Sequence, residues 1–408
     1  MKKTIMKTSH YAKLSVPAAI LSCAAAAFAQ TPPGTIPVGP MFLYPALEVA
    51  VKRDSNIAIQ PAAAAQSDTI GYLRPSVRLE AQQGVNIYSL GYSGEYGRYN
   101  SSTADNFENH TLTANANMTL DARNHLTAKL QYLDRVDPRG TLNLVATPTP
   151  NRYREPSVSG LYTYGADGAQ GKLELMGGYS NRQYLNNRIA TTQLDHARTD
   201  YGGTFLLRVQ PKTYATFNLR QSKFAYKDPT SITLDNTETS TLVGVRWEAT
   251  AVTAARFALG QQKKKFGNAV AGNQDFSGSS WEGSVNWKPL TYSSVDYNTF
   301  RRTSESTGLG NFSITQTHQV VWTHAWSSRV TSILTGLYSN EQFSDAPVAA
   351  TGGASREDTT KSAGLRVIYN MRRWLNMGVD YTFSTRDSND INFKYNRNQY
   401  MLFVAATL

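Results

Sequence analysis

The C-terminal residues of the chain place an apolar side chain at every second position. Counting back from Leu408, these are Ala406, Val404, Leu402 and Tyr400. Successive side chains of a β-strand point to opposite faces, so these residues form one apolar face. A soluble protein seldom ends in such a strand. An outer-membrane β-barrel needs one, because its last strand pairs with its first and meets lipid. Such barrels commonly end in Phe, and Leu408 departs from that pattern.

The N-terminal residues have the pattern of a secretion signal. Lys2, Lys3 and Lys7 form a positive start before an apolar stretch over residues 14–28, and Ala27-Phe28-Ala29 fits a small-residue cleavage site. We therefore predict a signal peptide over residues 1–29 and a mature chain that begins at Gln30. A membrane anchor is an alternative, although the apolar stretch is short for a membrane span.

Cys23 is the only cysteine. Lipoprotein processing at this residue is a second alternative, although Ile20-Leu21-Ser22 fits the required motif poorly. If cleavage follows Ala29, the mature chain has no cysteine. It then has no disulfide, no thiolate metal site and no cysteine nucleophile.

The composition separates two kinds of membrane protein. The mean hydropathy is −0.41, which excludes a bundle of lipid-embedded helices, and no other segment approaches the apolar length of a helical span. The chain nevertheless has 23 Tyr, 15 Phe and 6 Trp, which fits strands with one lipid face, one polar face and aromatic girdles. The net charge of +11 favours anionic partners. Secretion argues against nucleic acid as a partner.

Alternation of apolar and polar residues continues through the chain. In the segment 374–385, for example, Leu375, Met377 and Val379 oppose Asn376 and Asp380. Segments of about 10 to 14 residues suffice to cross a bilayer at a tilt. The clearest such segments are 108–121, 171–182, 278–288, 360–370 and 374–385.

The connections alternate between tight turns and longer polar loops. We count eight short turns, one of them at residues 288–290, and nine long loops, one of them over residues 342–357, the asymmetry expected of periplasmic turns and external loops. The sequence therefore predicts an all-β fold, a transmembrane antiparallel outer-membrane β-barrel of about 18 strands over residues 45–408. Residues 30–44, rich in Pro and Gly, form a periplasmic lead. The segment 46–53 is the weakest strand, with an unpaired lead as its alternative.

A soluble β-propeller is the main alternative fold. Strand pairs recur at roughly the 40-residue spacing of propeller blades. No blade motif accompanies this spacing, and the strands are long for blades.

Six segments carry a resemblance to a known family: Ala46 to Asn56, Tyr72 to Val77, Tyr92 to Tyr99, Asp105 to His110, Asp134 to Thr141 and Tyr395 to Tyr400. They resemble the outer-membrane β-barrel porins encoded in exopolysaccharide and capsule operons, including EpsL-type proteins. The resemblance spans most of the mature chain and implies export of an extracellular polysaccharide across the outer membrane.

Three functional hypotheses follow. The first is exopolysaccharide export. The second is a general or substrate-specific porin for small solutes, and the third is a structural or assembly barrel with a plugged lumen. Loops such as 136–154 are long enough to fold inward and narrow the barrel. The expected location is the outer membrane of a Gram-negative cell. The expected partners are membrane lipid and lipopolysaccharide, acidic polysaccharide and periplasmic export components.

If the apolar faces meet lipid, a set of charged residues points into the lumen. Such charges set the selectivity of a pore. An equally open interpretation is that they pair with one another across strands. The candidate residues of the cargo path are Arg78, Arg208, Arg220, Arg246, Arg366, Glu80, Glu174, Glu248, Glu282 and Asp380, with Lys129 as a further inward cation.

Catalysis and metal binding have little support in the sequence. The five histidines after residue 29 do not fall in a nucleophile or zinc motif, and no acidic cluster has ligand spacing. We therefore predict a protein that is not an enzyme, with no metal and no cofactor. The basic run Lys263-Lys264-Lys265 has three interpretations: contact with lipopolysaccharide phosphates, contact with an acidic polymer, or simple solvation.

Overall fold

Antiparallel strands account for most of the chain in the computed structural model, which describes residues 35–144, 147–250, 252–267, 275–348 and 352–407. The predicted signal peptide over residues 1–29 and the terminal Leu408 lie outside these ranges. No helix in the described ranges has the length and apolar character needed to cross a membrane.

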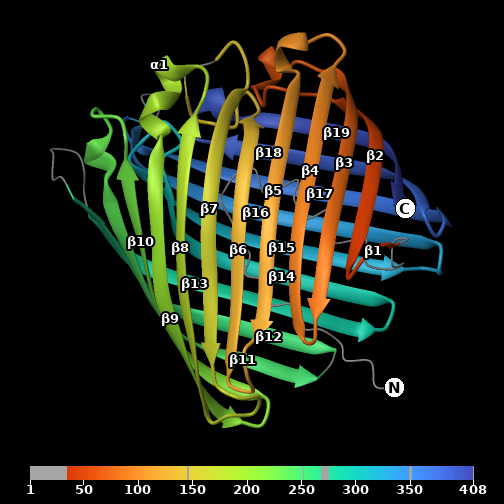
Figure 1. Ribbon diagram of the computed structural model, residues 1–408. Coiled ribbons are helices and arrows are strands. Elements are labelled where there is room, and N and C mark those ends of the chain that lie inside the picture. Colours follow the sequence, from red (N-terminus) through yellow and green to blue (C-terminus); the bar gives the residue numbers. More distant parts are fainter. Residues whose placement is uncertain (1–34, 145–146, 251, 268–274, 349–351, 408) are drawn as a thin grey trace. The chain divides into compact units, whose positions relative to one another are not determined.

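The strands belong to one sheet (Figure 1). Their bounds are β1 (Ile36–Val38), β2 (Met41–Asp54), β3 (Asp68–Gln83), β4 (Asn86–Tyr99), β5 (Phe107–Thr119), β6 (Asn124–Asp137), β7 (Asn151–Tyr164), β8 (Gly171–Tyr184), β9 (His196–Gln210), β10 (Thr213–Tyr226), β11 (Asn236–Thr250), β12 (Thr253–Phe266), β13 (Phe276–Leu290), β14 (Ser293–Glu305), β15 (Phe312–Ala325), β16 (Val330–Pro347), β17 (Ser355–Arg372), β18 (Leu375–Ser388) and β19 (Tyr395–Thr407).

Within the described ranges, helical structure is confined to single turns in the long loops. These are η3 (Ala62–Ala64), η4 (Thr103–Asp105), α1 (Arg188–Thr191), η5 (Thr192–Leu194), η6 (Ile232–Leu234) and η8 (Ile391–Phe393).

The last strand pairs with the first long strand and closes the barrel. The β19–β2 pairing runs from Thr407 opposite Ala46 to Gln399 opposite Asp54. Every strand from β2 to β19 is hydrogen-bonded antiparallel to the next, so the ring has 18 strands. The predicted fold class and strand number are confirmed. The segment 46–53 is paired on both sides, by β19 and by β3, so it is not an unpaired lead.

Short turns and long loops lie at opposite ends of the barrel. In Figure 1 the long loops, with α1, are at the upper end. Two boundaries differ from the sequence prediction. The turn expected at residues 288–290 lies after Leu290, and the loop expected over 342–357 is shorter, because β16 continues to Pro347 and β17 begins at Ser355. In β13 the strand continues because Leu290 still pairs with Ser293. In β16 the polar residues after Gln342 continue the strand, since strands of such barrels extend beyond the lipid into water.

The short strand β1 has a specific place in the sheet. β19 accompanies β2 only as far as Ala46, whereas β2 begins at Met41, before the predicted start of the barrel at residue 45. Ile36, Pro37 and Val38 of β1 pair with β2 over this extension. An uncovered strand edge is prone to pair with other chains, and β1 covers this one.

The two faces of the wall differ as the alternation predicts. Val243 and Leu259 are 59% exposed and point outward, while the neighbouring Leu242 is 3% exposed and points inward. Trp247, Trp287 and Trp374 are also exposed and lie near the short turns. Their position fits the aromatic girdle at the membrane interface.

Candidate functional site

All ten residues predicted for the cargo path have the strand phase of the inward face. In β11, Arg246 and Glu248 alternate with the exposed Val245 and Trp247. The ten residues are spread over eight strands, from β3 to β18. They therefore line the wall around the barrel and do not converge on one point.

Two bidentate ion pairs join strands that are not neighbours in the sheet. Arg220 of β10 donates to both carboxylate oxygens of Glu282 in β13, each at 2.8 Å. Arg246 of β11 donates to Glu174 of β8 at 2.7 and 3.0 Å. Side chains can meet across intervening strands only inside the curved wall. Each arginine is neutralised by a carboxylate, in agreement with the interpretation of paired charges.

A second charged group lies near the seam of the barrel. Arg366 of β17 is 3.8 Å from both Asp380 of β18 and Glu48 of β2. Arg74 of β3 contacts Glu48 at 2.5 Å and Glu95 of β4 at 2.8 Å. Arginines and carboxylates thus alternate around this part of the wall. The prediction omitted Arg74, Glu48 and Glu95, although their strand phase would have identified them.

The remaining predicted residues lie toward the short-turn end. Arg78 pairs with Glu80 on the same strand and stacks over the ring of Tyr44 at 4.2 Å. Arg208 and Glu248 are near the ends of β9 and β11, where their main chains bond to the adjoining turns. These residues are not brought into contact with the two bidentate pairs.

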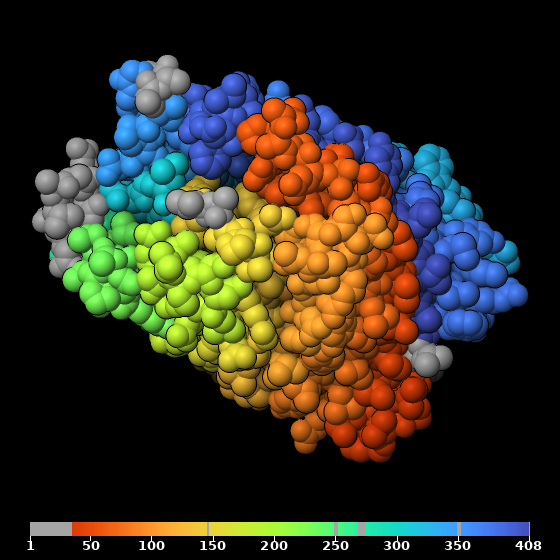
Figure 2. Space-filling view, turned by 90° about the horizontal axis from the view of Figure 1, so that it is seen from above, coloured from red at the N-terminus to blue at the C-terminus, as the bar shows by residue number. Residues whose placement is uncertain are grey.

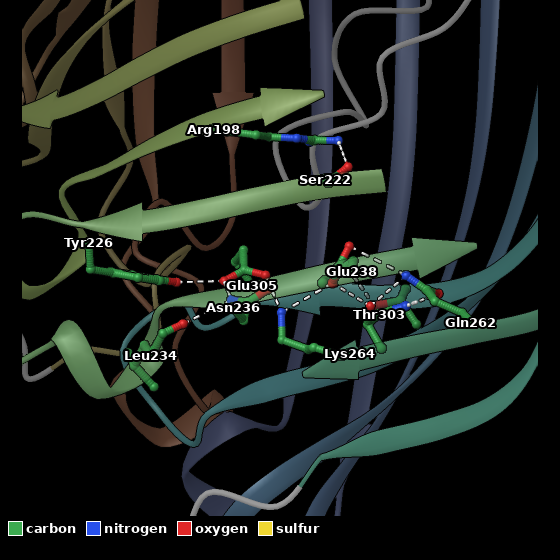
Figure 3. Close-up of polar contacts among 12 residues, drawn as sticks. Arg198, Ser222, Tyr226, Leu234, Asn236, Glu238, Gln262, Lys264, Thr303 and Glu305 are labelled. Atoms are coloured by element: carbon green, nitrogen blue, oxygen red, sulfur yellow. Dashed lines mark hydrogen bonds and ion pairs between the residues drawn. The ribbon is translucent and has the colours of Figure 1, made fainter. Parts of the chain in front are cut away.

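A polar network at the long-loop end was not predicted (Figure 3). Lys264 of β12 is fully buried and contacts Glu238 of β11 at 3.1 Å and Glu305 of β14. Tyr226 of β10 donates to Glu305 at 2.7 Å, and Thr303 of β14 donates to Glu238 at 2.5 Å. The network was missed because the three lysines were interpreted together as one basic run. Alternation along β12 places only the middle residue, Lys264, on the inner face.

The network coincides with a local separation of two strands. The β13–β14 pairing ends at Trp281 opposite Arg301, although both strands continue toward the long loops. Beyond that point Thr303 accepts a hydrogen bond at 2.7 Å from Gln262 of β12, across the end of β13. Side-chain contacts therefore replace the missing main-chain pairing.

Residues 138–144, which follow β6, extend over the long-loop end of the barrel. The Asn143 main chain donates to Thr307 at 2.9 Å, and the Asn143 side chain accepts from Arg356 of β17 at 2.8 Å. Thr307 lies between β14 and β15, roughly opposite β6 and β7 in the ring. Figure 2 looks onto this end of the barrel. Residues 138–144 therefore reach the β14–β15 loop and the start of β17, as expected for a segment that narrows the opening.

Two leucines of this loop anchor it to the near wall. Leu142 and Leu144 pack against the buried Tyr153, Tyr184 and Leu194 of the near wall.

Nearer the start of the loop, Arg139 donates to Asp105 at 2.7 Å. This hydrogen bond raises the pKa of the Arg139 guanidinium, which stabilises the charged pair. Gly140 has a φ of +77°, and a Cβ there would clash with the carbonyl oxygen of Ala58. The loop thus also packs closely against the loop between β2 and β3.

The histidines lie apart from one another. His318 contacts Tyr297 at 2.8 Å, and His324 lies 4.4 Å from the Trp326 ring, both on the outward phase of β15. In the described ranges no three His, Cys, Asp or Glu side chains are grouped to hold a metal ion.

Comparisons with known proteins agree with this architecture. The structure of Pseudomonas aeruginosa OccK1 (OpdK) is similar with a TM-score of 0.50 and 11% sequence identity, over 90% of this chain and 98% of that chain. The structure of Pseudomonas aeruginosa OpdK with vanillate also has a TM-score of 0.50, with 10% identity over 90% and 98% of the two chains. Identities this low show a shared fold and no more.

Among curated proteins no match to the sequence is found. The family model described as "Putative beta-barrel porin 2" matches residues 31–408. The chain therefore belongs to this family of β-barrel porins and is an outer-membrane β-barrel porin.

Proposed function

We propose that this porin is a narrowed channel for polar solutes of small cross-section. The observation that carries the proposal is the loop 138–150, which is fixed to opposite walls by Asn143 and by Leu142 and Leu144. A barrel of 18 strands is otherwise wide enough for an aqueous channel. A segment across its opening sets the size of what passes.

The charge pattern of the wall supports passage of polar solutes. Arg220 and Arg246 are each paired with a carboxylate, so the wall offers hydrogen bonds without a strong excess of one sign. Conduction requires that a solute bind the wall weakly enough to be released. Paired charges meet that requirement better than an unpaired arginine would.

Exopolysaccharide export is the second candidate, and the resemblance of segments such as Ala46 to Asn56 and Asp134 to Thr141 to porins of exopolysaccharide operons favours it. An extended polymer has a small cross-section and can pass a narrowed opening in single file. In this case acidic polysaccharide is the cargo, and periplasmic export components are the partners at the short-turn end.

Vesicle swelling tests the channel proposal. Vesicles containing the full chain are compared with vesicles containing a variant shortened between Pro138 and Pro150, using neutral sugars of increasing size. We expect the variant to admit larger sugars than the wild type. A variant shortened in the β18–β19 loop, residues 389–394, is the matched control. An unchanged size limit in the first variant would contradict the proposal.

Deletion of the gene separates the two candidates. Loss of surface polymer with normal uptake of small solutes supports export. Normal polymer secretion with reduced permeability to small solutes supports a solute porin.

A further inference from the structure

The three consecutive lysines of β12 are divided between the two faces of the wall. Lys264 is buried among inward-facing carboxylates. Its neighbours Lys263 and Lys265 are exposed and point outward, because side chains alternate along a strand. The chain therefore places two cations on the side of the barrel that meets the membrane.

A third lysine lies beside them on the outer face. Lys223 of β10 is exposed, and it pairs in register with Thr237 of β11, which pairs with Lys265 of β12. Strand spacing puts Lys223 and Lys265 about 10 Å apart at the main chain, with Lys263 about 7 Å further along β12. These three residues form the outer lysine cluster, and their flexible side chains are long enough to converge on one ligand.

The outer lysine cluster has no carboxylate partner within the described residues, where none of its members forms an ion pair. Some other outward cations near the long loops do have such partners. Arg98 contacts Glu108 at 2.5 Å, and Arg152 contacts Asp134 at 2.6 Å. The cluster is thus a local excess of positive charge on the outer wall.

The cluster lies directly above the apolar band of the barrel. Along the outward face of β12, Lys263 is followed toward the membrane by Gln261 and then by Leu259, which is exposed. On β10 the same order recurs, with Lys223 followed by Gln221 and the exposed Leu219. Cations at this level meet lipid head groups, and the adjoining apolar residues meet acyl chains.

We propose that the outer lysine cluster binds the phosphate groups of lipopolysaccharide in the outer leaflet. The cluster is at the long-loop end, which faces the cell exterior in barrels of this kind. Thr237 and Thr239 of β11 lie between the lysines and add hydroxyl donors. The lipid acyl chains then pack along Leu219, Val243 and Leu259. An acidic polymer moving through the lumen does not reach this surface, because the barrel wall separates them.

Binding of purified bisphosphorylated lipid A to the full chain in detergent tests the proposal, with native mass spectrometry as the readout. The variant Lys223→Gln, Lys263→Gln, Lys265→Gln removes the cluster. We expect its affinity to fall about a hundredfold, since each basic residue near an anionic surface contributes a factor of about five. The control variant Arg53→Gln, Lys361→Gln, Lys394→Gln removes the same charge from another part of the barrel and is expected to bind like the wild type.

Three results would overturn the proposal. The first is equal affinity of the wild type and the cluster variant for bisphosphorylated lipid A. The second is equal affinity of the wild type for lipid A from which the phosphates have been removed. The third is binding of an acidic polysaccharide at the cluster without binding of lipid A, which would assign the cluster to a polymer. Heat-modifiable gel migration of each variant verifies that it is folded.

Discussion

At the scale of single residues, burial decides what a lysine contributes to this barrel. Lys264 is fully buried between Glu238 and Glu305, whereas Lys263 is exposed. Removal of a buried cation leaves its carboxylates unpaired, which is strongly unfavourable. We expect Lys264→Met to lower the free energy of unfolding by about 3–5 kcal/mol, and Lys263→Gln by less than about 0.5 kcal/mol. Urea unfolding in lipid vesicles measures both, and similar values would show that the network contributes no stability.

The lumen arginines allow a test of charge pairing. In the double variant Arg220→Glu, Arg246→Glu, four carboxylates replace two ion pairs on the inner wall. We expect single-channel recordings to show a shift toward cation preference, because wall charge biases the ions in the lumen. The swap Arg220→Glu, Glu282→Arg keeps the pair and should leave the preference unchanged. An unchanged preference in the double variant would mean that ions pass elsewhere.

At the scale of single elements, the loop 138–150 is expected to hold its position during conduction. Asn143→Cys with Thr307→Cys, combined with Cys23→Ser, allows a disulfide where the two main chains are joined by a 2.9 Å hydrogen bond. We expect oxidation to leave the single-channel conductance within about twofold of the reduced form, since rigid elements need little rearrangement. A large fall in conductance on oxidation would show that the loop normally lies away from Thr307.

The sequence was informative for elements that depend on local patterns. Alternation and the difference between turns and loops were sufficient to predict 18 strands, because each strand must expose an apolar face to lipid. The pairing of Arg220 with Glu282 could not be predicted, since it depends on which strands approach across the curved wall. The same holds for Asn143 and Thr307, whose contact depends on a loop path that no periodicity encodes.

At the scale of the whole molecule, the seam between the first and last strands is held by a buried acid. Asp54 is 1% exposed and accepts two hydrogen bonds from Arg397, at 3.0 and 2.6 Å. We expect Asp54→Asn to lower the free energy of unfolding by about 3 kcal/mol, as for other buried pairs that lose one partner. Arg98→Gln, which breaks an exposed pair, should change it by less than about 1 kcal/mol. Equal effects of the two variants in urea unfolding would contradict a role for the seam pair.

The seam pair also has a consequence for biogenesis. Asp54 and Arg397 lie near opposite ends of the chain. Their ion pair can therefore form only when nearly the whole polypeptide is present. A truncated product that stops before Arg397 would leave Asp54 without its arginine partner and β2 with an open edge. Closure of the ring between β19 and β2 therefore depends on a chain that includes both strands.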